Sequence, residues 1–598
     1  MSAGARKAPR NPPWRSTWPL LPTVAFLGAF FLYPVIQLLW LSVIGPDRAF
    51  SLQHYAKLFS TPLYVQLLLS TFKVSFWTTV ICLVAAYPVA YVLAAIPDRW
   101  RLSLLLWVLM PFWTSFLVRT FAWIVLLGRN GAINDILQRV GVIERPLELL
   151  FNFGSVMVGM SHALMPLAVV TMLSVMQNID SNLMRAASTL GARRGQAFWR
   201  VYFPLSLPGI AASGLLIFIT ALGFFITPAL LGGRREMMIA QEIIFQLEEQ
   251  LNWGFAGAIA VMLLLATAVV FWLFDRVLGV STLSGAAADE AREGRSAGLF
   301  GKVVDRIGTC IIAALGAACA AAGALYDRIV PSHSARRRRS LGQLALWSAA
   351  IAIVVFLALP TFFVIPVSFS KTQYIAWPPN GFTLHWYEEF WDSPVWRAAM
   401  LRSVGVGVMT AVLAMLIGVP AAFVLARRRL AARTLIMSFI LSPLIFPHII
   451  VGVALFYLYS RVGLVGTSLG LVLGHTIFAI PYVVVTVMAV LRHYDNRLDQ
   501  AAASLGANRF RTLVWITLPL IRAGMVASFL FAFVKSFDEL AVSLFIAGGL
   551  TTTLPKKMWS DAILQVSPTL TAVSSATLVF VTVAILAAEL LSRRARRP

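Results

Sequence analysis

The sequence predicts an all-α membrane protein with about 12 transmembrane helices, arranged as two parallel repeats of six helices each. Three observations predict this fold. Of the 598 residues, 59% are hydrophobic and only 12% are charged, whereas ordinary soluble domains carry about 25% charged residues. Apolar stretches of about 20 residues, long enough to cross a bilayer, recur along the chain. Several motifs of the first half also occur again in the second half.

The first apolar stretch, 19–44, follows a short basic segment that contains Arg6, Lys7, Arg10 and Arg15. It is too long for the core of a signal peptide, and no small-residue cleavage site follows it, so we expect an uncleaved first helix. The other spans of the first half are expected at 66–97, 102–128, 153–176, 209–231 and 255–280. Those of the second half are expected at 343–368, 399–426, 434–460, 468–491, 523–547 and 568–591.

The two series of spans are copies of one unit. Pro166, Ala186 and Gly191 have counterparts in Pro481, Ala501 and Gly506, each 315 positions later. Because each copy has an even number of spans, both copies have the same orientation in the membrane. We therefore predict a first repeat over 1–282 and a second repeat over 343–598, joined by a basic, Ala-rich cytoplasmic linker over 283–342. The apolar run 308–325 within this linker is interpreted as a surface or mobile helix, because an additional crossing would invert the second repeat.

The net charge of +24 results from 49 Lys and Arg against 25 Asp and Glu. These cations cluster in short segments between apolar spans, which is typical of cytoplasmic loops and argues against a nucleic-acid partner. With the N-terminus inside, the cytoplasmic segments are 98–101, 177–208, 427–433, 492–522 and the C-terminal tail. Arginine clusters support this orientation in the second half, whereas several arginines of the first half fall outside.

Neither the cysteines nor the histidines form a recognisable site. Cys82, Cys310 and Cys319 have no CxxC spacing, so we expect neither a disulfide framework nor a zinc site. The seven histidines show no metal-ligand spacing, and His162 and His475 are expected to be packed polar residues within helices. No catalytic residues and no metal site are predicted, so we expect a protein that is not an enzyme.

The two long cytoplasmic loops, 177–208 and 492–522, share one pattern. Each predicts a short helix with two alanines, a glycine that permits a sharp turn, and an amphipathic stretch ended by proline. The residues are Arg185, Ala186, Ala187, Gly191 and Pro204 in the first loop and Gln500, Ala501, Ala502, Gly506 and Pro519 in the second. An interfacial helix lying on lipid is the alternative, and the repetition of the pattern on the same side weakens it.

This pattern resembles the EAA loop of ABC importer permeases, the coupling segment that docks on the ATPase subunit. The motifs Pro111-Phe112-Trp113-Thr114 and Trp253-Gly254-Phe255 resemble one subunit of the spermidine/putrescine permease pair. The motifs Gly381-Phe382-Thr383, Ser442-Pro443 and Ser536-Phe537-Asp538 resemble the other subunit, so the chain resembles a fusion of both. Arg185 and Gln500 replace the glutamate that opens the family motif, so the usual ion pair with the ATPase cannot form there.

The resemblance implies the type I ABC importer permease fold in a bacterial cytoplasmic (inner) membrane. It also implies two copies of an ATP-binding subunit that hold ATP and Mg, an extracytoplasmic substrate-binding protein and contact with membrane lipid. The chain itself has no P-loop, since Gly301-Lys302 lacks the first glycine and the following Ser or Thr of that motif. Hydrolysis therefore belongs to a separate subunit, and no cofactor is expected on this chain.

Ionisable residues within apolar spans are the candidates for the substrate pathway, because a charge at the centre of a membrane helix costs about 2.5 to 3.5 kcal/mol by insertion scales. Lys535, Asp538 and Glu539 share one helix face by spacing and form either a neutral structural cluster or a cation site. Arg119 either pairs with one of these acids or approaches the outer interface. Aromatic rings could surround a cation; the candidates are Trp113, Phe224, Phe225, Phe531 and Phe537.

We therefore predict a permease that alternates between outward and inward access for a polyamine-like or other small cationic solute. Related permeases carry ferric iron, thiamine, opines or aminophosphonates, and the acids do not choose among these solutes. The main alternative is a secondary transporter driven by an ion gradient, which also commonly contains two parallel halves of six helices. A membrane-embedded enzyme is a more distant alternative, because no catalytic cluster is found.

Overall fold

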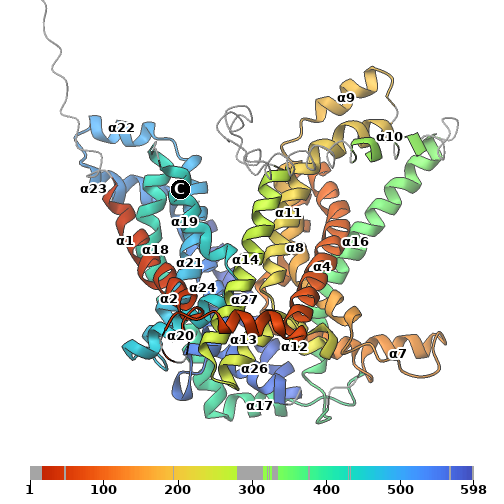
Figure 1. Cartoon of the computed structure of the whole chain (residues 1–598). Helices are drawn as coiled ribbons and strands as arrows, with labels where there is room; N and C mark the ends of the chain where they lie inside the picture. The colour runs from red at the N-terminus through yellow and green to blue at the C-terminus, as the bar shows by residue number, and fades with distance from the viewer. Residues whose placement is uncertain are drawn as a thin grey trace, which may run out of the picture. The chain divides into compact units, whose positions relative to one another are not determined.

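The computed structural model describes residues 17–278 and 335–594 apart from 46, 48, 193, 375–376, 429, 431 and 565–566, together with parts of 314–325. These residues are almost entirely helical (Figure 1). They contain no β-sheet; two isolated bridges join Ile44 to Phe50 and Ser370 to Phe382. The predicted all-α class is confirmed.

The chain divides into two compact units that do not coincide with the two sequence repeats. One unit contains residues 1–50, 386–565 and 576–598, and we call it the unit of the second repeat. The other contains residues 51–385 and 566–575, and we call it the unit of the first repeat. Each unit therefore takes the first helix of the opposite repeat.

The unit of the first repeat is built from long helices joined by short ones. Its helices are α3 (Gln53–Ser60), α4 (Pro62–Ala95), α5 (Asp98–Leu109), η4 (Met110–Trp113), α6 (Phe116–Leu127), α7 (Ala132–Arg139), α8 (Phe153–Met176), α9 (Ser181–Thr189), α10 (Arg194–Ala197), η5 (Phe198–Tyr202), α11 (Phe203–Leu222), α12 (Ile226–Leu231), η6 (Arg234–Glu236), α13 (Ile239–Glu248), α14 (Trp253–Leu278) and α16 (Ala335–Val367).

The unit of the second repeat begins with the N-terminal helix. Its helices are η2 (Trp18–Leu20), α1 (Leu21–Leu27), η3 (Gly28–Leu32), α2 (Tyr33–Leu41), α17 (His385–Asp392), α18 (Pro394–Arg427), α19 (Arg433–Ile445), α20 (His448–Val462), α21 (Ser468–Arg492), α22 (Arg497–Ser504), α23 (Arg509–Thr512), η9 (Leu513–Thr517), α24 (Leu518–Phe537), α25 (Ala541–Ile546), η10 (Gly549–Thr551) and α26 (Leu554–Leu564). The last helix, α27 (Pro568–Arg594), is divided, since its residues up to 575 belong to the unit of the first repeat and the rest to this unit.

Each unit has a core of three mutually packed helices, α4, α8 and α11 in one and α18, α21 and α24 in the other (Figure 1). The repeat is visible in how the last two of these helices approach. A Cβ atom at Gly209 would lie 2.9 Å from Cβ of Val175, and one at Gly524 would lie 2.4 Å from Cγ2 of Val490. Glycine at both positions lets the helix backbones come close, as is typical of helix packing in membranes.

The first helix of each repeat packs within the opposite unit. In the N-terminal helix, Thr23 Oγ1 donates to the carbonyl of Ile417 on α18 at 2.8 Å, and Phe31 lies edge-on against Phe446. Helix α16, the first of the second repeat, packs on α4, α5 and α6. There the ring of Phe356 contacts Trp123 and His162. The two repeats thus exchange their first helices.

Ten helices of the described residues are long and apolar enough to span a membrane, or eleven if α19 and α20 form one bent span. The expected spans 102–128 and 434–460 are each interrupted. The first breaks between η4 and α6, and the second bends by 94° between α19 and α20. Pro447 lies at the second break and Pro111 lies in η4, before the first, and each lacks the backbone N–H that a continuous helix would need there. The last expected span, 568–591, corresponds to α27 (Pro568–Arg594).

The expected spans 209–231 and 523–547 are also interrupted. Helix α11 ends at Leu222 before α12, and α24 ends at Phe537 before α25. Helix α16 begins at Ala335, inside the segment assigned to the linker from sequence. Most of the apolar run 308–325 lies outside the described residues.

Candidate functional site: the coupling segments and the buried charges

The two Ala-Ala segments form short, exposed helices at matching positions of the repeats. Helix α9 has no buried residue, and α22 buries only Ala502. Arg185 and Gln500 are both exposed. Each helix is followed by an almost fully exposed leucine, Leu190 at 87% and Leu505 at 88%. Exposed leucines therefore lie at equal positions of both repeats.

The two helices α9 and α22, which we call the coupling helices after the role that the sequence resemblance implies, end in the same glycine turn. Gly191 has φ of 83° and Gly506 has φ of 86°, a left-handed conformation that favours glycine. The N–H of each glycine donates to the carbonyl three residues earlier, and the next residue donates to the carbonyl five residues earlier. These paired bonds define a Schellman motif. The glycines predicted to make sharp turns therefore do so in both copies.

The prolines of the two loops do not end the amphipathic stretch, contrary to our expectation. Pro204 and Pro519 lie in the first turn of α11 and α24, and each stretch continues into the following span. A π-helical turn precedes each proline, η5 in the first copy and η9 in the second. The wider turn changes the local hydrogen-bond pattern, so the helix continues past a residue without an N–H.

A charged network attaches the second coupling helix to the end of α18. Asp499 Oδ2 accepts from Arg427 Nη1 at 2.6 Å. Asp499 Oδ1 accepts from the Tyr494 hydroxyl at 2.5 Å and from Thr517 Oγ1 at 3.0 Å. Burial and the hydrogen bond to the Asp499 carboxylate raise the pKa of Tyr494, so its hydroxyl stays a donor. One carboxylate thus joins α18, α22 and η9.

The first coupling helix has different surroundings. Met184 occupies the position that matches Asp499. Beside it, the turn η5 packs on α4 through aromatic rings: Tyr91 lies edge-on against Phe198 at 5.6 Å and against Tyr202 at 5.0 Å. Tyr87 on α4 also shares a hydrogen bond with Ser206 at 3.1 Å. The two coupling segments are therefore supported by different chemistry, charged in the second copy and largely aromatic in the first.

Lys535 and Glu539 are brought together at the break between α24 and α25. Lys535 Nζ donates to Glu539 Oε2 at 2.8 Å, and His448 Nδ1 lies 3.4 Å from the same oxygen. The other carboxylate oxygen accepts from the N–H of Val542 at 3.5 Å, in the first turn of α25. Glu539 is only 2% exposed. Lys535 and Glu539 are therefore in contact, as their spacing predicts, and His448 also belongs to this cluster.

Aromatic and polar side chains close around this cluster. The ring of Phe478 stacks on His448 with centroids 4.1 Å apart, and Lys535 Nζ lies 5.5 Å from the Phe478 centroid. His475 lies within hydrogen-bond distance of two hydroxyls, Ser536 Oγ at 2.8 Å and Ser543 Oγ at 3.1 Å. The prediction that His475 is a packed polar residue is confirmed, and His162 is likewise buried.

The other candidate pathway residues of the second repeat differ in exposure. Asp538 is half-buried at the C-terminal cap of α24, beside Glu539 and not within a continuous span. Phe537 is buried and stacks on Phe533. Phe531 is exposed on α24. Phe478, which no expectation included, is the ring that faces the Lys535 ammonium.

In the unit of the first repeat, Arg119 is buried on α6. It donates to the carbonyl of Ala163 at 3.1 Å, and its guanidinium lies 4.1 Å from the centroid of the Phe116 ring. Phe224 lies edge-on against Phe116, so a cation and two rings form one contact series. Phe225 is buried. Trp113 lies in η4, and its side chain is outside the described part.

Several of these residues could not be selected from sequence spacing. Asp499 and Arg427 are 72 positions apart, and His448 and Lys535 are 87 positions apart. For Asp499, a comparison of the two repeats gives a clue. It is a charged residue at the position where the first repeat has Met184, within an otherwise matching segment. Leu190 and Leu505 also correspond, but only the structure shows that both are exposed.

The family model described as binding-protein-dependent transport system inner membrane component matches residues 58–278 and 414–597. The chain is 32% identical over 264 residues to the spermidine/putrescine transport system permease protein PotB of Salmonella typhimurium. This alignment covers 43% of this chain and 92% of that protein. It is 31% identical over 254 residues to the spermidine/putrescine transport system permease protein PotC of Escherichia coli, covering 42% of this chain and 96% of that protein. The chain thus resembles a fusion of two such permeases.

A solved structure of a bacterial alginate ABC transporter, in complex with an alginate pentasaccharide-bound periplasmic protein, also aligns with the chain. The TM-score is 0.39 at 18% sequence identity, over 44% of this chain and 93% of that chain.

Proposed function

Because this chain belongs to the family of binding-protein-dependent transport system inner membrane components, we propose that it forms the membrane pathway of an ATP-driven importer. The observation that carries this proposal is the pair of exposed coupling helices, α9 and α22, each closed by a glycine turn. Two equivalent docking elements match a motor that acts as two copies of one ATPase subunit. Its closing and opening would switch the pathway between outward and inward access.

The separate ATPase subunits hold ATP and Mg, and this chain supplies their docking surface. Leu190 and Leu505 are the apolar contacts of that surface, because burial of an exposed leucine against a partner contributes favourable free energy to binding. Arg185 and Gln500 are exposed on the same helices and replace the acid of the family motif. Docking at these two positions therefore proceeds without that acid.

The solute is a polyamine-like or other small cation. The names of the two relatives support a polyamine, and Asp538 and Glu539 supply carboxylates at the break between α24 and α25. Lys535 already occupies one oxygen of Glu539, so a cationic solute would compete with that ammonium or meet Asp538. An extracytoplasmic binding protein delivers the solute, and both chain termini lie in the cytoplasm.

Co-purification with the ATPase subunit tests the docking surface. The double variant Leu190→Ser and Leu505→Ser should lose the ATPase while the chain remains inserted. Leu550→Ser is the matched control, because Leu550 is also exposed but lies on η10, which the proposed orientation places on the opposite side. Unchanged co-purification of the double variant would contradict the proposed docking role.

The solute class is tested separately by calorimetric titration of the partner binding protein. We expect binding of spermidine or putrescine. Binding of a phosphonate or another anion alone would contradict the cationic solute while leaving the importer class intact.

A further inference from the structure

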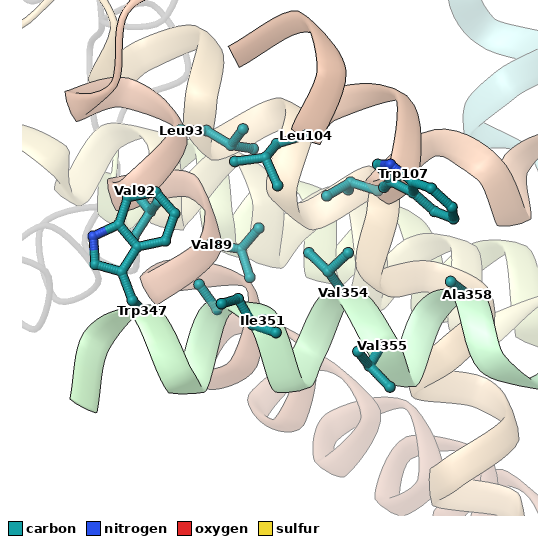
Figure 2. A pocket seen from close by; sticks show the side chains of 12 residues that line it. Val89, Val92, Leu93, Leu104, Trp107, Trp347, Ile351, Val354, Val355 and Ala358 are labelled. Atoms are coloured by element: carbon teal, nitrogen blue, oxygen red, sulfur yellow. The ribbon is translucent and has the colours of Figure 1, made fainter. Parts of the chain in front are cut away.

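An apolar groove lies in the unit of the first repeat, between α4, α5 and α16 (Figure 2). Its volume is about 320 Å³, and only apolar or aromatic side chains line it. Val92 and Leu93 come from α4, Leu104 and Trp107 from α5, and Trp347 and Ile351 from α16. The groove therefore follows the contact between α16 and the first repeat.

The groove is open along α5 and α16. Trp107, Trp347, Ile351 and Val355 line it and are exposed, although each is large and apolar. Water is poorly stabilised at such a surface, because it finds few hydrogen-bond partners there. Because α4 and α16 are candidate membrane spans, the medium around the groove is hydrocarbon.

One end of the groove is basic. In Figure 2, Leu93, Val92 and Trp347 lie at one end, whereas Trp107 and Ala358 lie at the other. Helices α5 and α16 therefore run in the same direction along it, and α5 begins at the Leu93 end. Arg99 and Arg101 lie in the first turn of α5, and Arg336–Arg339 follow the first residue of α16.

The two described arginines at this end differ in availability. Arg101 is engaged with the C-terminal end of α4, since its Nε donates to the carbonyl of Leu93 at 2.8 Å and its Nη2 to that of Ile96 at 2.9 Å. Arg99 is exposed, with its guanidinium 5.8 Å from the centroid of the Trp100 ring. Arg99 is therefore placed to meet a ligand at the mouth of the groove.

We propose that this groove binds one acyl chain of an anionic phospholipid, whose headgroup lies against Arg99 at the start of α5. The apolar lining suits a hydrocarbon chain. Clusters of Lys and Arg beside a membrane span attract anionic headgroups, and tryptophans are enriched at the headgroup level. A bound chain would fill the space that side chains leave between the exchanged helix α16 and α4.

Native mass spectrometry of the purified full-length chain tests this site after reconstitution into nanodiscs of phosphatidylcholine and phosphatidylglycerol. The wild type should retain phosphatidylglycerol in preference to phosphatidylcholine. Ala350→Phe fills the groove from α16 and should lower retention several-fold, whereas Ala349→Phe, on the exposed side of the same helix, should not. Arg99→Gln should reduce the headgroup preference about fivefold, as expected for one arginine near a membrane surface.

Equal retention in Ala350→Phe and Ala349→Phe would overturn the site, and so would a wild type that retains no lipid. Retention without headgroup preference would overturn the anionic part of the proposal. If Ala350→Phe fails to fold, the thermal stability of the wild type with added lipid still tests the proposal. Added phosphatidylglycerol should raise its thermal midpoint more than phosphatidylcholine, and equal shifts would overturn the proposal.

Discussion

Glu539 is almost completely buried, and its charge is compensated by Lys535 at 2.8 Å and by the neighbouring His448. A charge at the centre of a membrane helix costs about 2.5 to 3.5 kcal/mol on insertion scales, so a paired acid is retained more easily than a single one. The i, i+4 spacing of Lys535 and Glu539 predicts this contact from sequence. His448 could not be predicted, because it reaches the pair from a different helix that begins after the bend at Pro447.

Removal of the Lys535 ammonium should destabilise the protein. Breaking a buried ion pair from one side costs about 3 to 5 kcal/mol, and the low end applies because the Lys535 side chain is 19% exposed. We expect Lys535→Met to lower the thermal midpoint, and Lys535→Met with Glu539→Gln to regain most of the loss. Lys557→Met removes the more exposed pair with Asp561 and should have a smaller effect. A double variant no more stable than Lys535→Met would contradict the pairing.

Asp538 should serve transport more than folding. It is half-buried at a helix cap, and Asp538→Asn keeps its shape while removing the charge. We expect uptake to fall about tenfold, the equivalent of ~1.4 kcal/mol, with unchanged amounts of folded protein. Uptake assays and size-exclusion chromatography of the same preparations measure both quantities. Normal transport together with lost expression would favour a structural role.

At the level of secondary-structure elements, the two coupling helices have the same shape and different supports. Both end in a Schellman motif at a left-handed glycine. The second is attached to α18 through Asp499, whereas the segment after the first packs through aromatic rings. Sequence spacing predicts both helices and both turns, because Ala-Ala and glycine recur at one offset. It does not predict the π turns, in which the helix passes each proline without ending.

Asp499→Ala should loosen the second coupling helix. Hydrogen bonds to a charged group contribute about 1.5 to 3 kcal/mol, with the lower values expected here because the Arg427 and Asp499 side chains are 27% and 21% exposed. We expect several-fold less uptake per ATP hydrolysed while the ATPase remains bound. Met184→Ala, at the matching position of the first copy, is the control. Failure of Asp499→Arg with Arg427→Asp to restore any coupling would argue against the ion pair as its cause.

Gly506→Pro and Gly191→Pro should uncouple ATP hydrolysis from uptake. Proline cannot adopt the φ of 86° or 83° found here, and it also removes the N–H that donates to Ala503 or Ser188. Gly463→Pro places the same strain, at a φ of 72°, at the end of α20, which the proposed orientation places on the opposite side of the membrane from the coupling loops. We expect uncoupling in the first two variants and not in the third. Unchanged transport in Gly506→Pro and Gly191→Pro would contradict the coupling role.

For the whole molecule, the sequence predicts the helical class, the two repeats and most spans, because apolar length and internal repetition determine these features. It does not predict that α16 packs on α4 or that the N-terminal helix packs on α18, since hydrophobic patterns do not identify the partner of an apolar face. It also misses the breaks in the third and fifth spans of each repeat. The break in the fifth span of the second repeat places Asp538 and Glu539 between α24 and α25.

The most direct test of the central claim is uptake by proteoliposomes that contain this chain with or without its ATPase subunit. We predict uptake only with the ATPase, ATP and the loaded binding protein together, and its loss in Gly506→Pro. Uptake by the chain alone, driven by an ion gradient, would contradict an ATP-driven importer and favour a secondary transporter.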